Sequence, residues 1–295
     1  MRGVVFTQSV PSTFSAGSSA ASPGTAAKPL FGAKTPGADG VPYFIFRAQP
    51  DVTFRGTLVI VHGIGRNSLM HATHLGRVAS ATGYHVVAPH FSRHQFRRFQ
   101  LAYDPDARAN AATGLIRVLA DASLQHGIDT ARPVLIGYSG GAQFAHRAVL
   151  AGSMQPRAMI LVAPGWYTFP DTTTDWPRGL RAGPTQPLDA VVRLVEVPTA
   201  VMVGERDTRR GASLNTDPHV DLQQGQTRVE RAERWVAAVR QAASCVELAP
   251  DIRLRLIPKA AHDAQRNFLR HQLAERIVSE ANFLTKQSGD PYENL

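Results

Sequence analysis

Ser139 stands at the centre of Gly137-Tyr138-Ser139-Gly140-Gly141, a stretch that fits the pattern G-x-S-x-G. An apolar run precedes it and a helix-favouring segment follows, so the serine is expected at a sharp turn between a strand and a helix. Such a turn exposes the hydroxyl for attack on a carbonyl carbon. Glycines at 137 and 141 let the strand and the helix approach closely. The pattern is short and also occurs without catalysis, so the rest of the chain must supply a base, an acid and an oxyanion hole.

His262 is the candidate base. It follows residues 252–257, an apolar run that predicts the last strand, and two small residues precede it. Among the 11 histidines of the chain, it is the one that follows a buried strand C-terminal to both of its expected partners. A lone histidine often has only a structural role.

Asp207 is the favoured acid. It lies in the turn after residues 199–203, which predict a buried strand, and this position puts its carboxylate at the carboxyl edge of a sheet. Glu205, two positions earlier, is read as a turn residue. Asp171 and Asp175 remain alternatives, because they lie in the loop that follows the preceding expected strand, 158–162.

An oxyanion hole needs backbone N–H groups directed at the developing negative oxygen. Gly140 supplies one as the residue after the nucleophile. The second is expected from Ile64 in the stretch His62-Gly63-Ile64-Gly65, which follows another apolar run. His62 is expected to brace this loop and to take no part in the chemistry.

These residues require a sheet whose strands alternate with helices. Ser68 is expected to cap the first helix, and Gly127 to close the second. The alternation predicts an α/β fold with a mostly parallel central sheet and helices on both faces. The expected strands are 41–48, 57–61, 84–88, 134–138, 158–162, 199–203 and 252–257, and the expected helices are 68–81, 106–126, the segment behind Ser139, 228–243 and 263–283.

With these motifs in place, the chain resembles the α/β-hydrolases over residues 41–285. The resemblance rests on HGIG after a strand, on GYSGG, and on an aspartate and a histidine after later strands. Within the family it is similar to dienelactone-hydrolase-like and polyhydroxyalkanoate-depolymerase-like esterases. The resemblance implies a Ser-acid-His order along the chain, the α/β-hydrolase fold and the hydrolysis of carboxylic esters without a cofactor or a metal.

The domain organisation follows from composition. Residues 1–40 are expected to be a disordered or leader segment, 41–285 the catalytic domain and 286–295 a C-terminal tail. No apolar run approaches the roughly 20 residues that a membrane-spanning helix needs. The single cysteine excludes an intrachain disulfide, which fits a cytoplasmic protein while leaving export open.

The residues that bind the substrate are expected in the loop 164–187, which carries Trp166, Tyr167 and Phe169. We interpret this loop as a lid whose aromatic rings, with Tyr138, form an apolar pocket; the alternative is that it only packs over the sheet edge.

The expected partner is a small or polymeric ester, and the oligomeric state is open. A net charge of +9 favours anionic surfaces in general, but the basic stretch 93–98 is short and is read as a solvated loop, so no nucleic acid is expected. The alternatives for function are an amidase or peptidase, an acyltransferase, and a non-catalytic binding protein of the same fold.

Overall fold

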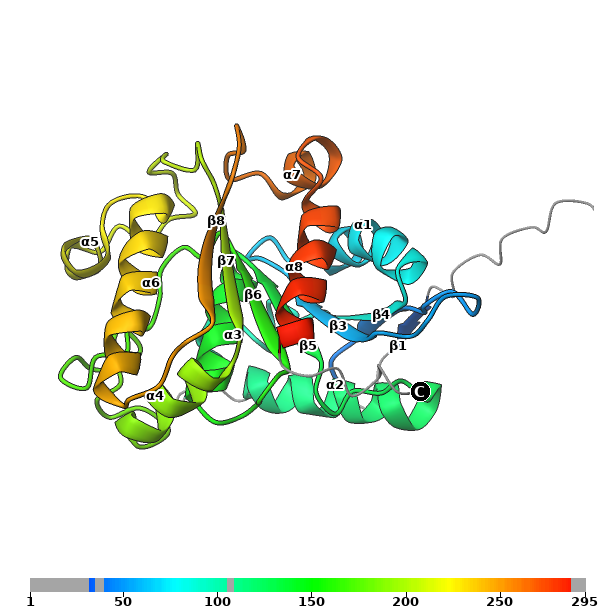
Figure 1. Ribbon diagram of the computed structural model, residues 1–295, viewed down its shortest axis with the longest axis horizontal. Helices are drawn as coiled ribbons and strands as arrows, with labels where there is room; N and C mark the ends of the chain where they lie inside the picture. Colours follow the sequence, from blue (N-terminus) through cyan, green and yellow to red (C-terminus); the bar gives the residue numbers. More distant parts are fainter. Residues whose placement is uncertain (1–31, 35–39, 105–108, 288–295) are drawn as a thin grey trace, which may run out of the picture.

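The computed structural model describes residues 32–34, 40–104 and 109–287. Its described residues form one eight-stranded sheet in the order β1-β2-β4-β3-β5-β6-β7-β8 (Figure 1). β1 and β2 join the edge antiparallel, and the remaining strand pairs are parallel. The strands are β1 (Gly32–Lys34), β2 (Tyr43–Phe46), β3 (Gly56–Val61), β4 (Tyr84–Pro89), β5 (Val134–Tyr138), β6 (Ala158–Val162), β7 (Thr199–Gly204) and β8 (Ile252–Ile257).

The central strands β3, β5, β6 and β7 are buried at every position because helices cover both faces of the sheet. In β3, Val59 and Val61 join the hydrophobic cluster on one face, whereas Leu58 and Ile60 join the cluster on the other. One face is covered by α1 (Ser68–Ala81) and α8 (Leu273–Gln287), and the opposite face by α2 (Ala111–His126), α3 (Gly140–Leu150), α4 (Pro187–Glu196) and α6 (Arg228–Cys245). The expected α/β-hydrolase fold is thereby confirmed.

Several local expectations need correction. Ser68 does not cap α1; Asn67 occupies that position without a side-chain cap, and the Ser68 hydroxyl instead contacts His90 Nδ1 at 2.9 Å. The single helix expected over 263–283 is two helices, α7 (Ala264–Arg270) and α8, because the chain turns at Gln272, which has a φ of 52°. Three further elements were not expected from the sequence: η1 (Phe99–Leu101), α4 and α5 (Pro218–Gln224).

The expected terminal segments are only partly described. Residues 32–34 form β1 and pair with β2, so this part of the segment expected to be disordered is a strand. The rest of that segment up to residue 39, and residues 288–295 of the expected tail, lie outside the described residues.

The topology brings the candidate residues to one edge. Parallel strands end on the same side of a sheet, and that side is at the top of Figure 1. The HGIG stretch follows β3, Ser139 follows β5, Asp207 follows β7 and His262 follows β8. Across the described ranges, no helix is long and apolar enough to cross a bilayer.

Candidate active site

Ser139 occupies a strained turn between β5 and α3. Its φ of 51° and ψ of −108° lie outside the regions that side chains ordinarily adopt. The turn is held because the Ser139 N–H donates to the Val162 carbonyl at 2.7 Å. A Cβ at Gly137 would lie 2.2 Å from the Gly141 carbonyl oxygen, and one at Gly141 would lie 2.0 Å from that of Val61. The two glycines are therefore required by close backbone contacts, as the motif predicts.

Asp207 and His262 meet because the turns after β7 and β8 are hydrogen-bonded to each other. The Arg206 N–H donates to the Ala260 carbonyl at 2.8 Å, and the Lys259 N–H donates to the Glu205 carboxylate at 3.0 Å. His262 Nδ1 then lies 2.8 Å from Asp207 Oδ2. A carboxylate only accepts hydrogen bonds, so Nδ1 carries the proton and Nε2 keeps a lone pair. The imidazole is thus held in the tautomer that a general base needs.

The alternative acids lie elsewhere. Asp171 accepts hydrogen bonds from Thr173 and Thr174 within its own turn, and Asp175 pairs with Arg181 at 2.6 Å. Neither makes a contact with His262 in the part of the chain that is described. Of the three aspartates considered, the structure brings Asp207 to the histidine.

Ser139 and His262 line one cavity of about 180 Å³. No hydrogen bond joins their side chains among the described contacts, although both face this space. Tyr138 forms another wall, with its ring stacked on that of His262 at a centroid distance of 5.7 Å. Burial, with the charge of Asp207 as a further cause, raises the pKa of Tyr138, so its hydroxyl stays protonated. Tyr138 thus lies beside the cavity, and its contact with a substrate stays a prediction.

The two amides expected for the oxyanion hole are close together. A Cβ at Gly140 would lie 3.3 Å from the Ile64 backbone nitrogen. Neither the Gly140 N–H nor the Ile64 N–H has a hydrogen-bond acceptor among the described residues. Two unpaired donors beside the serine are suited to binding a negatively charged oxygen.

His62 holds the HGIG loop in place. Its Nδ1 donates to the Gly63 carbonyl at 2.9 Å, and its Nε2 accepts from the Phe91 N–H at 3.0 Å. Burial lowers the pKa of His62 to about 4, so the ring is neutral near pH 7 and keeps both contacts. The geometry is that of a brace between the loops after β3 and β4.

Arg228 is a partner of the acid that was not expected from the sequence. Its Nη1 lies 3.1 Å from Asp207 Oδ1, and the two side chains are 2% and 1% exposed. Its Nη2 donates to both the carbonyl and the hydroxyl of Ser213 at 3.0 Å. The buried carboxylate therefore has His262 on one oxygen and a guanidinium on the other.

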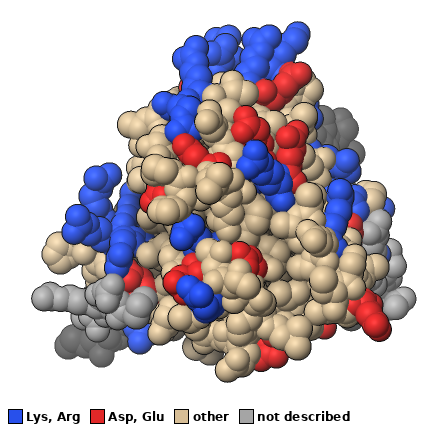
Figure 2. Space-filling view, turned by 90° about the vertical axis from the view of Figure 1, so that its left-hand side faces the viewer, with Lys and Arg blue, Asp and Glu red and all other residues tan. Residues whose placement is uncertain are grey.

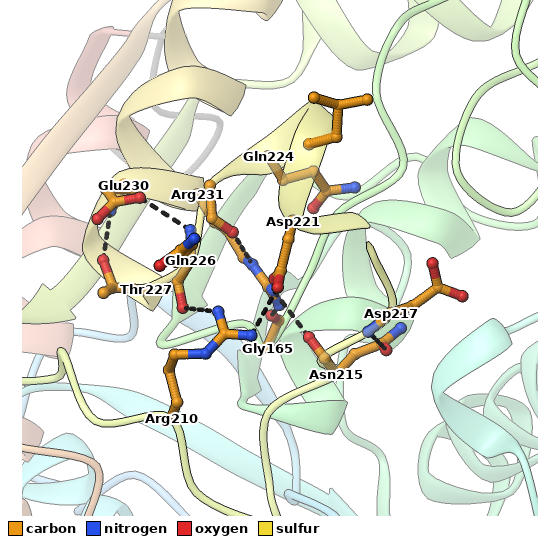
Figure 3. Close-up of polar contacts among 12 residues, drawn as sticks. Gly165, Arg210, Asn215, Asp217, Asp221, Gln224, Gln226, Thr227, Glu230 and Arg231 are labelled. Atoms are coloured by element: carbon orange, nitrogen blue, oxygen red, sulfur yellow. Dashed lines mark hydrogen bonds and ion pairs between the residues drawn. The ribbon is translucent and has the colours of Figure 1, made fainter. Parts of the chain in front are cut away.

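Arg231 secures the chain that follows the acid (Figure 3). Its side chain is fully buried and donates to the carbonyls of Gly165 and Asn215 and to the Asp221 carboxylate. Arg210 binds the other oxygen of the same carboxylate at 2.6 Å. The loop after β7 is thereby tied to the loop after β6 and to α5, which limits the movement of the acid.

The three aromatic residues of the 164–187 loop that were expected in the substrate pocket lie elsewhere. The fully buried Tyr167 ring stacks on Trp235 at 4.8 Å, and Phe169 belongs to the core cluster on the same face. Trp166 lies under the Arg147 guanidinium at 4.1 Å. None of the three lines the cavity that contains Ser139. The pocket assignment is therefore wrong for all three: two of these rings lie in the core, and the third packs against Arg147 of α3.

The sequence gives little indication that Arg228 and Arg231 are buried beside carboxylates. Arg228 and Arg231 open a predicted helix, where arginine is an ordinary surface residue, and their partners lie 21 and 10 residues away. A buried charge needs an opposite partner, but one sequence does not show which residue supplies it.

A strained serine after β5 and an acid–imidazole pair after β7 and β8, on a parallel sheet covered on both faces, define the α/β-hydrolase class. A sequence profile of the alpha/beta hydrolase family matches residues 58–285, and the chain belongs to this family. Among curated proteins, the sequence comparison found no match.

Solved structures with a similar fold include several hydrolases. Poly(aspartic acid) hydrolase-1 from Sphingomonas sp. KT-1 is 23% identical, with a TM-score of 0.74 over 85% of this chain and 99% of that one. LpqC, a poly(3-hydroxybutyrate) depolymerase from Bordetella parapertussis, is 24% identical, with a TM-score of 0.73 over 88% and 94%. A protein assigned as a dienelactone hydrolase from Klebsiella pneumoniae is 17% identical, with a TM-score of 0.55 over 88% and 98%. The expected branches are both represented among these folds.

Proposed function

We propose that the protein is a serine hydrolase of carboxylic esters that works through Ser139, His262 and Asp207. One observation carries the proposal: His262 Nδ1 lies 2.8 Å from a buried Asp207 carboxylate, and the same imidazole lines the cavity that holds Ser139. A base whose tautomer is set by an acid, next to a serine on a strained turn, is the arrangement that activates a hydroxyl.

The reaction proceeds in two halves. Ser139 Oγ attacks the ester carbonyl carbon while His262 Nε2 takes its proton, and a tetrahedral intermediate forms. The bond to the alcohol oxygen then breaks, and His262 returns the proton to the departing alcohol. Water attacks the acyl-enzyme, His262 takes a proton from it, and collapse of the second intermediate releases the acid and reprotonates Ser139.

The Gly140 and Ile64 amides stabilise the negative oxygen of both intermediates. Removing one such donor costs about 10²- to 10³-fold in turnover in a serine protease. Asp207 keeps the imidazole oriented and stabilises its positive charge, and Arg228 holds the carboxylate in place through its ion pair with Oδ1.

The similar structures do not distinguish between an ester and an amide as the bond that is cleaved. Poly(aspartic acid) has amide links and poly(3-hydroxybutyrate) has ester links, and both named hydrolases have this fold. We favour the ester because an ester is more easily cleaved than an amide by an acyl-enzyme mechanism. A small or a polymeric ester fits the proposal equally.

The test has two parts. A fluorophosphonate probe should label the wild-type protein and leave Ser139→Ala unlabelled, which separates an enzyme from a binding protein of the same fold. A series of p-nitrophenyl esters of increasing acyl length should then be hydrolysed by the wild type, with matched p-nitroanilides turned over far more slowly. Labelling at another residue, or faster cleavage of the anilides, would refute the proposal.

A further inference from the structure

A second and larger cavity, of about 510 Å³, lies directly beside the serine cavity. The two share His262 and Ser213 as lining residues, so they meet at the catalytic imidazole. The attack of Ser139 on an ester and the release of its acyl group do not require this larger cavity. An ester whose carbonyl sits at Ser139 can therefore extend a second part of its chain past His262 into it.

The lining of this cavity is strongly basic. Four of its cationic side chains are exposed and make no ion pair with any described residue: Arg206, Arg209, Lys259 and Arg266. Arg228 adds a fifth cation, which is buried; its Nε has no hydrogen-bond acceptor among the described residues. The cavity thus offers several donors that lack a negative partner.

The two acids of the lining do not cancel this charge. Asp207 is already bound by His262 and Arg228. Asp263 caps α7, where one of its oxygens accepts from the Arg266 N–H at 2.9 Å. The nearby Glu205 accepts from the Lys259 N–H and is not part of the lining. The unpaired charge on the walls of the cavity remains positive.

The surface view agrees with this distribution. Figure 2 shows Lys and Arg side chains gathered at the top of the molecule, the side on which β7 and β8 end in Figure 1. A smaller hollow that shares Asp263 and Arg266 carries Arg270 as a further cation. Positive charge that lines a hollow attracts anions, and arginine pairs with carboxylates through two parallel hydrogen bonds.

We propose that this basic cavity binds a carboxylate of the substrate, so that the preferred substrate is an ester that also carries a free acid group a few bonds from the scissile carbonyl. The inference rests on the proposed ester hydrolysis and specifies its substrate class. The ester lies at Ser139, its chain passes Ser213 and His262, and its carboxylate contacts the arginines beyond them.

The kinetic test compares two esters of equal acyl length, mono-p-nitrophenyl adipate and p-nitrophenyl hexanoate. We expect a higher kcat/KM for the adipate ester, and the ratio of the two values should fall as salt is added. Each of Arg206→Gln and Arg266→Gln should lower this ratio by about 2- to 5-fold, the range expected for one exposed charge pair. Arg132→Gln is the matched control: it removes an exposed arginine just before β5, at the opposite edge of the sheet, and should leave the ratio unchanged.

A binding test works independently of turnover. The Ser139→Ala protein is titrated by calorimetry with monomethyl adipate, methyl hexanoate and inorganic phosphate. The proposal is supported if monomethyl adipate binds and methyl hexanoate does not, and if this binding is weaker when Arg206→Gln and Arg266→Gln are added to Ser139→Ala. Equal binding of the two esters, no binding of either, or binding of phosphate without monomethyl adipate overturns it. The failure of the carboxylate site can be told apart from the failure of ester hydrolysis. If Ser139 turns over both p-nitrophenyl esters and no arginine variant changes the ratio of their kcat/KM values, the carboxylate site is refuted and ester hydrolysis stands. If neither ester is turned over, ester hydrolysis is refuted, and the calorimetric titration alone tests the carboxylate site.

Discussion

Asp207→Asn is the sharpest perturbation, because the carboxylate has two buried partners with different roles. Asparagine keeps the size of the side chain but removes its charge, and it can donate to His262 Nδ1 and so favour the wrong tautomer. The same change in a serine protease lowers turnover by about 10⁴-fold. At about 1.4 kcal/mol for each factor of ten, this is a loss of about 5 kcal/mol of transition-state stabilisation.

The same change should also destabilise the fold. Arg228 is 2% exposed and has its ion pair with Asp207 at 3.1 Å, so the variant leaves a buried guanidinium without a negative partner. Removing one partner of a buried ion pair lowers the free energy of unfolding by roughly 3 to 5 kcal/mol. We therefore expect Asp207→Asn to lower the free energy of unfolding, measured in urea by circular dichroism, by about that amount.

The two effects can be separated. In Asp207→Asn/Arg228→Met the unpaired charge is gone, so part of the lost stability should return, whereas hydrolysis of p-nitrophenyl butyrate should stay absent. Asp171→Asn is the matched control, because its carboxylate binds threonines of its own turn; its turnover should stay close to that of the wild type. If folded Asp207→Asn keeps more than about a tenth of wild-type kcat/KM, the acid has been wrongly assigned.

Three further predictions concern other parts of the site. Ser139→Ala should abolish ester hydrolysis with an unchanged urea midpoint, and residual turnover within tenfold of the wild type would exclude Ser139 as the nucleophile. Gly137→Ala should destabilise the protein by about 1 to 3 kcal/mol or more, because its Cβ would lie 2.2 Å from the Gly141 carbonyl oxygen; an unchanged thermal midpoint would contradict this. Burial lowers the pKa of His71 to about 3, so between its unfolded pKa of about 6.5 and pH 3 the unfolded chain binds a proton that the folded chain does not. The free energy of unfolding should therefore fall as the pH drops from 7 to 5, and by less in His71→Phe; equal losses in both proteins would show that His71 does not contribute.

The sequence by itself determined the sheet and the chain positions of the candidate chemistry. Continuous apolar runs predicted the buried central strands, and alternation with helices predicted their parallel order. Since parallel strands end on one side, the positions of Ser139, Asp207 and His262 after three such strands were enough to expect them at a common edge. The elbow glycines could be read locally because strand and helix are adjacent in the chain.

Only the tertiary structure decided between Asp207 and the aspartates of the 164–187 loop. All three follow a strand, and the choice depends on hydrogen bonds between the turns after β7 and β8, which are far apart in sequence. The burial of Tyr167 depends in the same way on contact with α6.

The charge pattern of the site also required the fold. Arg228 and Arg266 lie in segments whose local pattern is that of ordinary helix starts, yet one is buried against the acid and the other lines an open basic cavity. Periodicity shows which face of a helix is apolar, but a charge acquires its role from partners and from solvent exposure. Both of these depend on segments that come together only when the chain has folded.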